Sequence, residues 1–114
     1  MSNFREQLLK LTERRFAPAG LPGFPDLRVR SLFGDEREIL ERRIQDDPTR
    51  AKRHLMIACL CGPHDDVPIF TYADFDSFGS MDSSVLDAVA GAAMKIAKFS
   101  EQDVQSLMGE RVAP

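Results

Sequence analysis

The first apolar positions of the chain recur at helical spacing. Phe4, Leu8 and Leu11 fall on one stripe, with charged residues between them, which predicts an amphipathic helix over residues 3–15. Five Pro and Gly residues then fall within residues 16–25, which predicts an irregular linker because these residue types interrupt regular elements. A helix on such a linker would be a mobile arm whose apolar stripe can dock on a neighbouring molecule.

The next stretch alternates and then becomes helical. Apolar and polar residues alternate over residues 27–32, which is the period of a half-buried strand. Apolar residues then recur at helical spacing over 35–45, with acidic residues first and basic residues last, as the helix dipole favours. The predicted buried stripe of this helix is Ile39, Leu40 and Ile44.

A basic segment runs into an apolar one over residues 48–61. Asp47 followed by Pro48 is typical of an N-cap and the first helical residue, so we predict a helix here. A strand over residues 55–61 is the alternative, because periodicity does not separate a short buried strand from a buried helix.

Shorter elements follow a Gly-Pro break at residues 62–63. Residues 67–70 predict a short extended piece. Thr71, with Asp74 three residues later, predicts a capped short helix whose core anchors are Phe75 and Phe78.

The clearest helical pattern starts after Asp82 or Ser83. Its apolar positions are Val85, Leu86, Val89, Ala93, Ile96 and Ala97. Another capping pattern at Ser100 predicts a last helix through Met108.

These elements predict a mainly α fold. We expect a small bundle of five or six short helices, with at most a minimal β element around 27–32 and 67–70. The predicted organisation is an N-terminal helix and Pro/Gly-rich linker over 1–25, a single helical domain over 26–109 and a flexible tail over 110–114.

The charge is unevenly distributed along the 114 residues. Residues 1–53 carry 12 basic and 9 acidic side chains, whereas residues 54–114 carry 3 and 9, within a net charge of −3. Two solvated faces are the simpler interpretation. The alternative is a molecule with a positive and a negative end, which can stack head to tail into a ring or a spiral.

Targeting and membrane signals are missing from the sequence. The N-terminus is charged early and no run approaches the roughly 20 apolar residues that a membrane span needs. Cys59 and Cys61 are too close for an ordinary disulfide. We therefore expect a soluble cytoplasmic protein with reduced thiols.

One cluster has metal-binding residue types. His54, Cys59, Cys61 and His64 lie close in sequence. On a helix, Cys59 and Cys61 would point about 200° apart and could not share a zinc ion, whereas on a strand they would share a face. Buried cysteines acting as small hydrophobic residues are the favoured interpretation, so no cofactor is expected. The sequence also lacks phosphate-binding and hydrolase motifs, so we predict a protein that is not an enzyme.

A basic stretch over residues 42–53 raises the alternative of a small nucleic-acid-binding regulatory protein. It contains Arg42, Arg43, Arg50 and Arg53, around a junction between two predicted helices. The acidic sequence pI of about 5.3 argues against this alternative, because specific binders usually carry a stronger basic footprint.

The order of the pieces resembles the tail assembly chaperones of long-tailed bacteriophages and prophages. The resemblance covers residues 26–108. It consists of the 27–32 strand and a charged helix, a basic helix running into Ile57–Cys61, the Ile69-Phe70-Thr71 turn, an acidic short helix and a helix that begins near Val85-Leu86-Asp87.

The resemblance implies a non-catalytic role in viral morphogenesis. Members of this family bind the tape measure protein, keep its apolar helical segments in solution and help to recruit tail tube protein. They act in the bacterial host cell, are absent from the mature virion and can assemble side by side in a spiral. The resemblance assigns no single binding residue. From the apolar stripe and the basic stretch, the candidate contacts for another copy or for the client are Phe4, Leu8, Leu11, Arg42, Arg43, Arg50 and Arg53.

Overall fold

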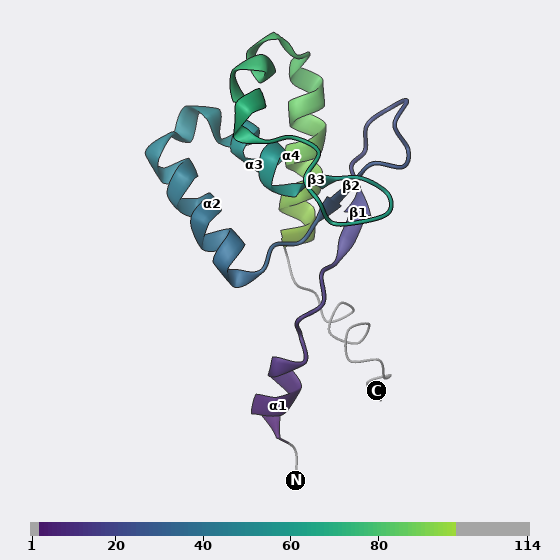
Figure 1. Ribbon diagram of the computed structural model, residues 1–114, viewed down its shortest axis with the longest axis vertical. Helices are drawn as coiled ribbons and strands as arrows, with labels where there is room; N and C mark the ends of the chain where they lie inside the picture. Colours follow the sequence, from purple (N-terminus) through teal and green to yellow (C-terminus); the bar gives the residue numbers. More distant parts are fainter. Residues whose placement is uncertain (1–2, 98–114) are drawn as a thin grey trace.

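A small antiparallel sheet lies among helices in the computed structural model, which describes residues 3–97 (Figure 1). The helices are α1 (Phe4–Leu9), α2 (Gly34–Asp46), α3 (Ala51–Cys59) and α4 (Ser83–Ala97), with 3-10 helices η1 (Pro48–Arg50) and η2 (Tyr72–Ser80). The strands are β1 (Phe16–Pro18), β2 (Arg28–Arg30) and β3 (Leu60–Cys61), in the order β1-β2-β3. The prediction of a mainly helical fold with a minimal sheet is confirmed.

Strand β1 corrects the predicted linker. Residues 16–25 were expected to be irregular, but Ala17 pairs with Val29 of β2, and Ala19, directly after the strand, is fully buried. Proline is tolerated here because β1 is an edge strand, where Pro18 needs no ladder hydrogen bond on its outer side. The segment expected to link the arm to the domain therefore begins as part of the sheet.

The choice between helix and strand over residues 55–61 is resolved by a change of element. Helix α3 ends at Cys59 and β3 follows at once, because the backbone of Leu60 is already extended. Val29 pairs with Leu60 in this antiparallel ladder. The predicted extended piece at 67–70 contributes one isolated bridge, from Pro68 to Cys61.

The core forms where α3 packs between α2 and α4, and where the sheet packs on α4. Val29, Met56, Leu60, Phe78 and Val89 are its largest fully buried apolar side chains. The apolar stripes of the helices pack against one another because this burial removes their side chains from water.

Local capping starts two of the helices, and the cap at Thr71 is the one that the sequence predicted. The Thr71 hydroxyl accepts a hydrogen bond from the Ala73 amide, and Asp74 accepts one from the Thr71 amide, at the start of η2. Asp82 accepts from the Ser84 amide at the start of α4. The predicted helix at 100–108 and tail at 110–114 lie outside the described residues.

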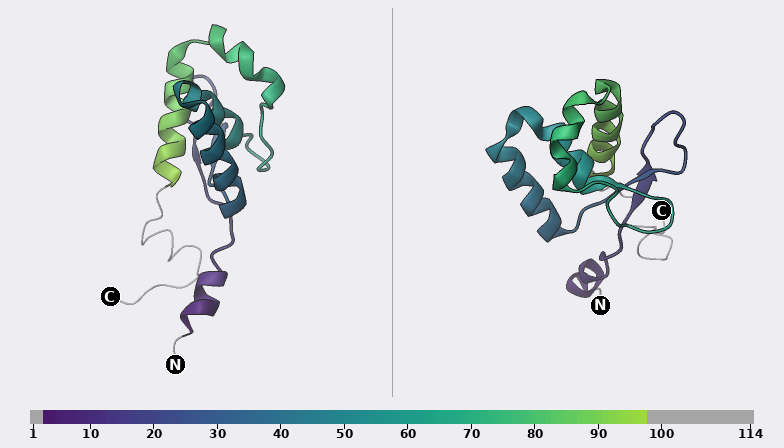
Figure 2. Two further views of the ribbon diagram at one scale, coloured as in Figure 1. Left: turned by 90° about the vertical axis from the view of Figure 1, so that its left-hand side faces the viewer. Right: turned by 45° about the horizontal axis from the view of Figure 1, so that its top comes forward.

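Helix α1 is shorter than the 3–15 helix predicted from the apolar stripe. It ends at Leu9 because the chain is soon held in an extended conformation. The Ser31 amide donates to the Arg15 carbonyl at 2.8 Å, and the Arg15 amide donates to the Ser31 hydroxyl at 2.7 Å. Figures 1 and 2 show α1 standing away from the other helices.

Candidate functional site

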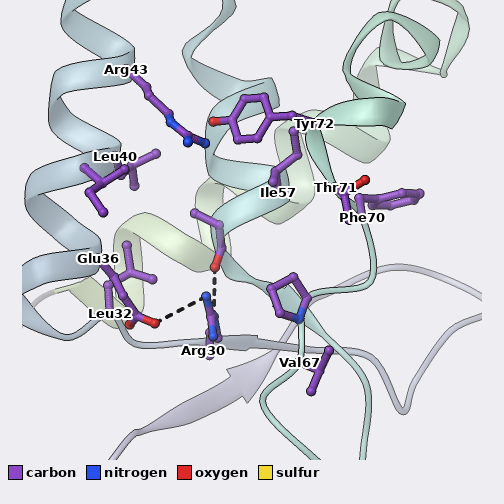
Figure 3. A pocket seen from close by; sticks show the side chains of 13 residues that line it. Arg30, Leu32, Glu36, Leu40, Arg43, Ile57, Val67, Phe70, Thr71 and Tyr72 are labelled. Carbon is purple, nitrogen blue, oxygen red and sulfur yellow. Dashed lines mark hydrogen bonds and ion pairs between the residues drawn. The ribbon is translucent and has the colours of Figure 1, made fainter.

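An apolar groove lies between α2, α3 and the segment 67–72 (Figure 3). We call it the α2 groove. Its cavity volume is about 410 Å³, and its apolar lining is Leu32, Ile39, Leu40, Ile57, Ala58, Val67, Pro68 and Phe70. The prediction that Ile39 is buried is wrong: its side chain is 50% exposed at the rim of the groove, whereas Leu40 is buried as predicted.

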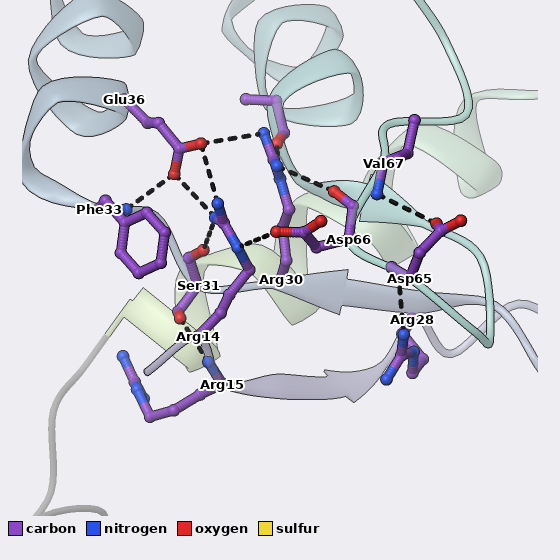
Figure 4. Close-up of polar contacts among 11 residues, drawn as sticks. Arg14, Arg15, Arg28, Arg30, Ser31, Phe33, Glu36, Asp65, Asp66 and Val67 are labelled. Carbon is purple, nitrogen blue, oxygen red and sulfur yellow. Dashed lines mark hydrogen bonds and ion pairs between the residues drawn. The ribbon is translucent and has the colours of Figure 1, made fainter. Parts of the chain in front are cut away.

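Charged side chains close one end of the α2 groove. Glu36 accepts two hydrogen bonds from Arg14, at 2.7 and 3.0 Å, and lies 3.6 Å from the Arg30 guanidinium (Figure 4). Arg14 also pairs with Asp66 at 2.8 Å. These contacts join the segment after α1, the start of α2 and the loop after β3.

The two arginines of β2 fix that loop through its backbone. Arg28 donates to the carbonyls of Gly62 and Asp65, each at 2.9 Å. Arg30 donates to the carbonyls of Ala58 and Asp66, at 2.8 and 2.9 Å. Arg28 and Arg30, the charged residues of the alternating strand pattern, therefore have a structural role. They hold the loop that leads into the wall of the groove.

Glu36 has a second role at the start of α2. It accepts a hydrogen bond from the Phe33 amide at 2.8 Å, which satisfies one of the free amides of the first turn. The Arg14 hydrogen bond, against the opposing effect of burial, holds the pKa of the Glu36 carboxyl below its usual value. The carboxylate is therefore ionised at neutral pH, and its partners are Arg14, Arg30 and the Phe33 amide.

Arg43 and Tyr72 form the other end of the α2 groove. The Arg43 guanidinium stacks on the Tyr72 ring, 4.1 Å from its centroid (Figure 3). Tyr72 also stacks on Phe75, with ring centroids 5.8 Å apart. Among residues 3–97, no carboxylate pairs with Arg43.

A buried histidine, His54, forms a hydrogen bond with the Tyr72 hydroxyl. His54 is only 6% exposed, and its two ring nitrogens lie 2.8 Å from the Tyr72 hydroxyl and 3.1 Å from an Asp47 oxygen. In a neutral imidazole, one nitrogen donates to Asp47 and the other accepts from Tyr72. This chain orients the tyrosine at the groove.

The structure brings three of the four predicted basic residues together. Arg50 and Arg53 each lie 5.4 Å from the Phe75 centroid, close to the Arg43–Tyr72 stack. Arg50 pairs with Asp47 at 3.1 Å, and Arg53 donates to the Phe75 carbonyl at 3.2 Å. Part of the basic stretch thus serves internal contacts. Arg42 is exposed and is not part of the groove lining.

The residues of the considered metal site do not gather. Cys59 ends α3 and Cys61 lies in β3; both are buried, whereas His64 is exposed. Among residues 3–97, no three His, Cys, Asp or Glu side chains are placed to hold a metal ion. Burial raises the pKa of the Cys59 thiol to about 11, which suppresses its reactivity.

The arm residues are the second uncovered apolar feature. Phe4 is 71% exposed, Leu8 66% and Leu9 59%. Leu11 was predicted to share their stripe, but it lies beyond the end of α1 and is half-buried. Helix α1 therefore presents apolar side chains that its own domain does not cover.

Sequence reasoning missed the groove and its charged end. Arg14, Glu36 and Tyr72 come from distant segments, so no local spacing marks them as neighbours. One signal was present: Glu36 stands three residues after Phe33, the spacing at which a glutamate caps a helix start.

Comparisons with known proteins give no family for this fold. No protein-family model matches the chain, and neither a curated protein nor a solved structure is significantly similar to it. Within residues 3–97, none of the helices is both long and apolar enough to cross a membrane.

Proposed function

We propose that this protein is a non-catalytic assembly chaperone of a bacteriophage or prophage tail. It binds apolar helical segments of the tape measure protein and aids tail tube assembly. The observation that carries the proposal is the α2 groove, an apolar cavity of about 410 Å³ with exposed apolar side chains at its rim. Clefts of this size bind ligand side chains mainly by removing apolar surface from water.

The two uncovered apolar features have different roles in this proposal. The α2 groove receives the client, because its walls are fixed by the Arg28 and Arg30 contacts and are ready before binding. Helix α1 docks on a neighbouring copy, because it stands on a short extended segment outside its own core. The resulting oligomer presents several grooves to one long client, which raises the overall affinity.

The proposal places the protein in the cytoplasm of the bacterial host. It acts while the tail is built and is absent from the mature virion. Its other partner is tail tube protein, which it helps to recruit. Finding the gene between a tail tube gene and a long tape measure gene would support this role.

Co-purification tests the proposed function. The tagged full chain is expressed with the tape measure protein from the same genome, and the tagged chain is then captured. We expect the tape measure protein to co-elute and to stay in the supernatant after centrifugation. A tape measure protein that pellets equally with and without the chain contradicts the proposal. Retention of nucleic acid that salt removes would instead support the regulatory alternative.

A further inference from the structure

The two ends of the α2 groove differ in how their charges are used. At one end, Glu36 is paired with Arg14 and Arg30, and Arg30 also donates to two backbone carbonyls. At the other end, Arg43 stacks on Tyr72 and has no carboxylate partner among residues 3–97. The groove thus offers one unpaired cation beside an apolar floor.

The shape of the groove fits a helix. It runs along the Glu36–Arg43 face of α2, which covers about two turns and is opposed by residues 67–72. An amphipathic helix presents apolar side chains at positions i, i+3, i+4 and i+7, which also span two turns. The exposed rim residues Ile39 and Val67 can then close over those side chains.

We propose that the α2 groove binds an amphipathic helix that carries an Asp or Glu next to its apolar stripe, and that this carboxylate pairs with Arg43. The inference rests on the proposed function, since it names the kind of tape measure segment that the chaperone takes. The stacked guanidinium is pre-positioned by Tyr72, which His54 and Asp47 hold through hydrogen bonds. Little side-chain conformational entropy is therefore lost when the ion pair forms.

Helix α1 of a second copy fits the groove less well. Glu6, the one acidic side chain of α1, is two residues from both Phe4 and Leu8. Two residues correspond to about 200° around a helix, so Glu6 would face away from Arg43 when Phe4 and Leu8 enter the groove. Glu6 shares a face only with Leu9, three residues on, which lies at the edge of that stripe. Charge complementarity therefore favours an acidic client over the arm.

Two synthetic peptides and two variants of the full chain test this inference. The peptides carry Leu at i, i+3, i+4 and i+7 in the same helical background, and they differ only by Glu or Lys at one flanking position. The variants are Arg43→Glu and Arg42→Glu, which make the same charge change on adjacent residues of α2. Binding is measured by fluorescence anisotropy at low salt.

The wild-type chain and Arg42→Glu should bind the Glu peptide about threefold to tenfold more tightly than the Lys peptide. Arg43→Glu should reverse this preference. A reversal cannot result from misfolding, because a misfolded chain loses both peptides. An unchanged preference in Arg43→Glu, or an equal change in both variants, overturns the inference.

The outcomes separate this inference from the proposed function. If the chain co-purifies with tape measure protein but binds neither peptide, the proposed function is supported. The inference that the α2 groove binds an acidic helix is then overturned. A mass in light scattering that falls in Arg43→Glu but not in Arg42→Glu identifies a second copy as the occupant and overturns the inference. A chain that binds neither peptide and does not bind the tape measure protein contradicts the proposed function itself.

Discussion

Arg14 and Glu36, which lie 22 positions apart in the chain, form a two-pronged ion pair with donor–acceptor distances of 2.7 and 3.0 Å. The pair ties the chain just after α1 to the first turn of α2. A planar guanidinium meeting a carboxylate in this way combines charge with fixed geometry. It gives the arm a rigid base and closes one end of the α2 groove.

The first prediction concerns Glu36→Gln. Because the pKa of Glu36 is lowered in the folded state, the ionised carboxylate stabilises the fold above the usual glutamate pKa of about 4.3. That stability is lost as the pH falls below this value. Glu36→Gln should lower the free energy of unfolding at pH 7 by about 1–2 kcal/mol and flatten its fall in acid. Urea unfolding between pH 7 and pH 3 measures both effects.

Glu41→Gln is the matched control for this prediction. Glu41 pairs with Arg37 at 2.9 Å on the exposed face of the same helix. Exposed pairs at this spacing contribute only about 0.3–0.5 kcal/mol. Equal losses in the two variants would show that the Arg14–Glu36 pair has no special role.

The second prediction separates the arm from the domain. Deleting residues 1–12 removes α1 but leaves Arg14 and β1, so the melting temperature should stay nearly unchanged. Deleting residues 1–20 also removes the edge strand and the buried guanidinium. It should lower the free energy of unfolding by at least about 3 kcal/mol.

The same two deletions test self-association. If α1 docks on a neighbouring copy, the shorter deletion alone should reduce the mass of any oligomer to that of the monomer. Light scattering measures this mass at several protein concentrations. An oligomer that survives loss of residues 1–12 contradicts the docking role of α1.

The third prediction compares two phenylalanines. Phe78 is 1% exposed and meets Phe70 edge to face, with ring centroids 5.1 Å apart. Phe78→Ala should cost about 3–5 kcal/mol because it leaves a cavity in the core. Phe4→Ala changes an exposed side chain of α1 and should alter stability by less than about 0.5 kcal/mol. Thermal unfolding distinguishes them, and equal costs would place Phe4 in a packed environment.

The fourth prediction concerns the thiols. With a pKa of about 11, only about one Cys59 in a thousand is ionised at pH 8, and Cys61 is fully buried. A thiol reagent such as DTNB should therefore react with neither cysteine in the folded protein and with both after unfolding in guanidinium. Rapid reaction of the folded chain would contradict the burial of both thiols.

Most of the helices could be predicted from the sequence because the patterns that indicate a helix are local. The apolar spacing from Val85 to Ile96 predicted α4, and Thr71 with Asp74 predicted the start of η2. These patterns depend on neighbours within one or two turns of the chain. The same local logic overextended α1, because the Arg15–Ser31 hydrogen bonds that end the helical region are long-range contacts.

The candidate site was harder to predict for the same reason. Pro18 argued against a strand, yet an edge position accepts proline, and only the tertiary pairing reveals the edge. Arg43 was selected as part of a basic stretch, and its actual partner is the ring of Tyr72, 29 residues later. Ile39 was predicted to be a core residue because spacing alone does not separate a core face from the rim of an open groove.

Co-expression with the tape measure protein of the same genome tests the central claim most directly. The wild-type chain is compared with Ile39→Asp, at the rim of the α2 groove, and with Phe24→Asp, an exposed apolar residue in the loop after β1. The amount of tape measure protein in the supernatant is measured. The account predicts that wild type and Phe24→Asp keep it there and that Ile39→Asp loses most of it. Equal amounts with all three chains would contradict the groove as the client site, and no effect of the wild-type chain would contradict the chaperone function.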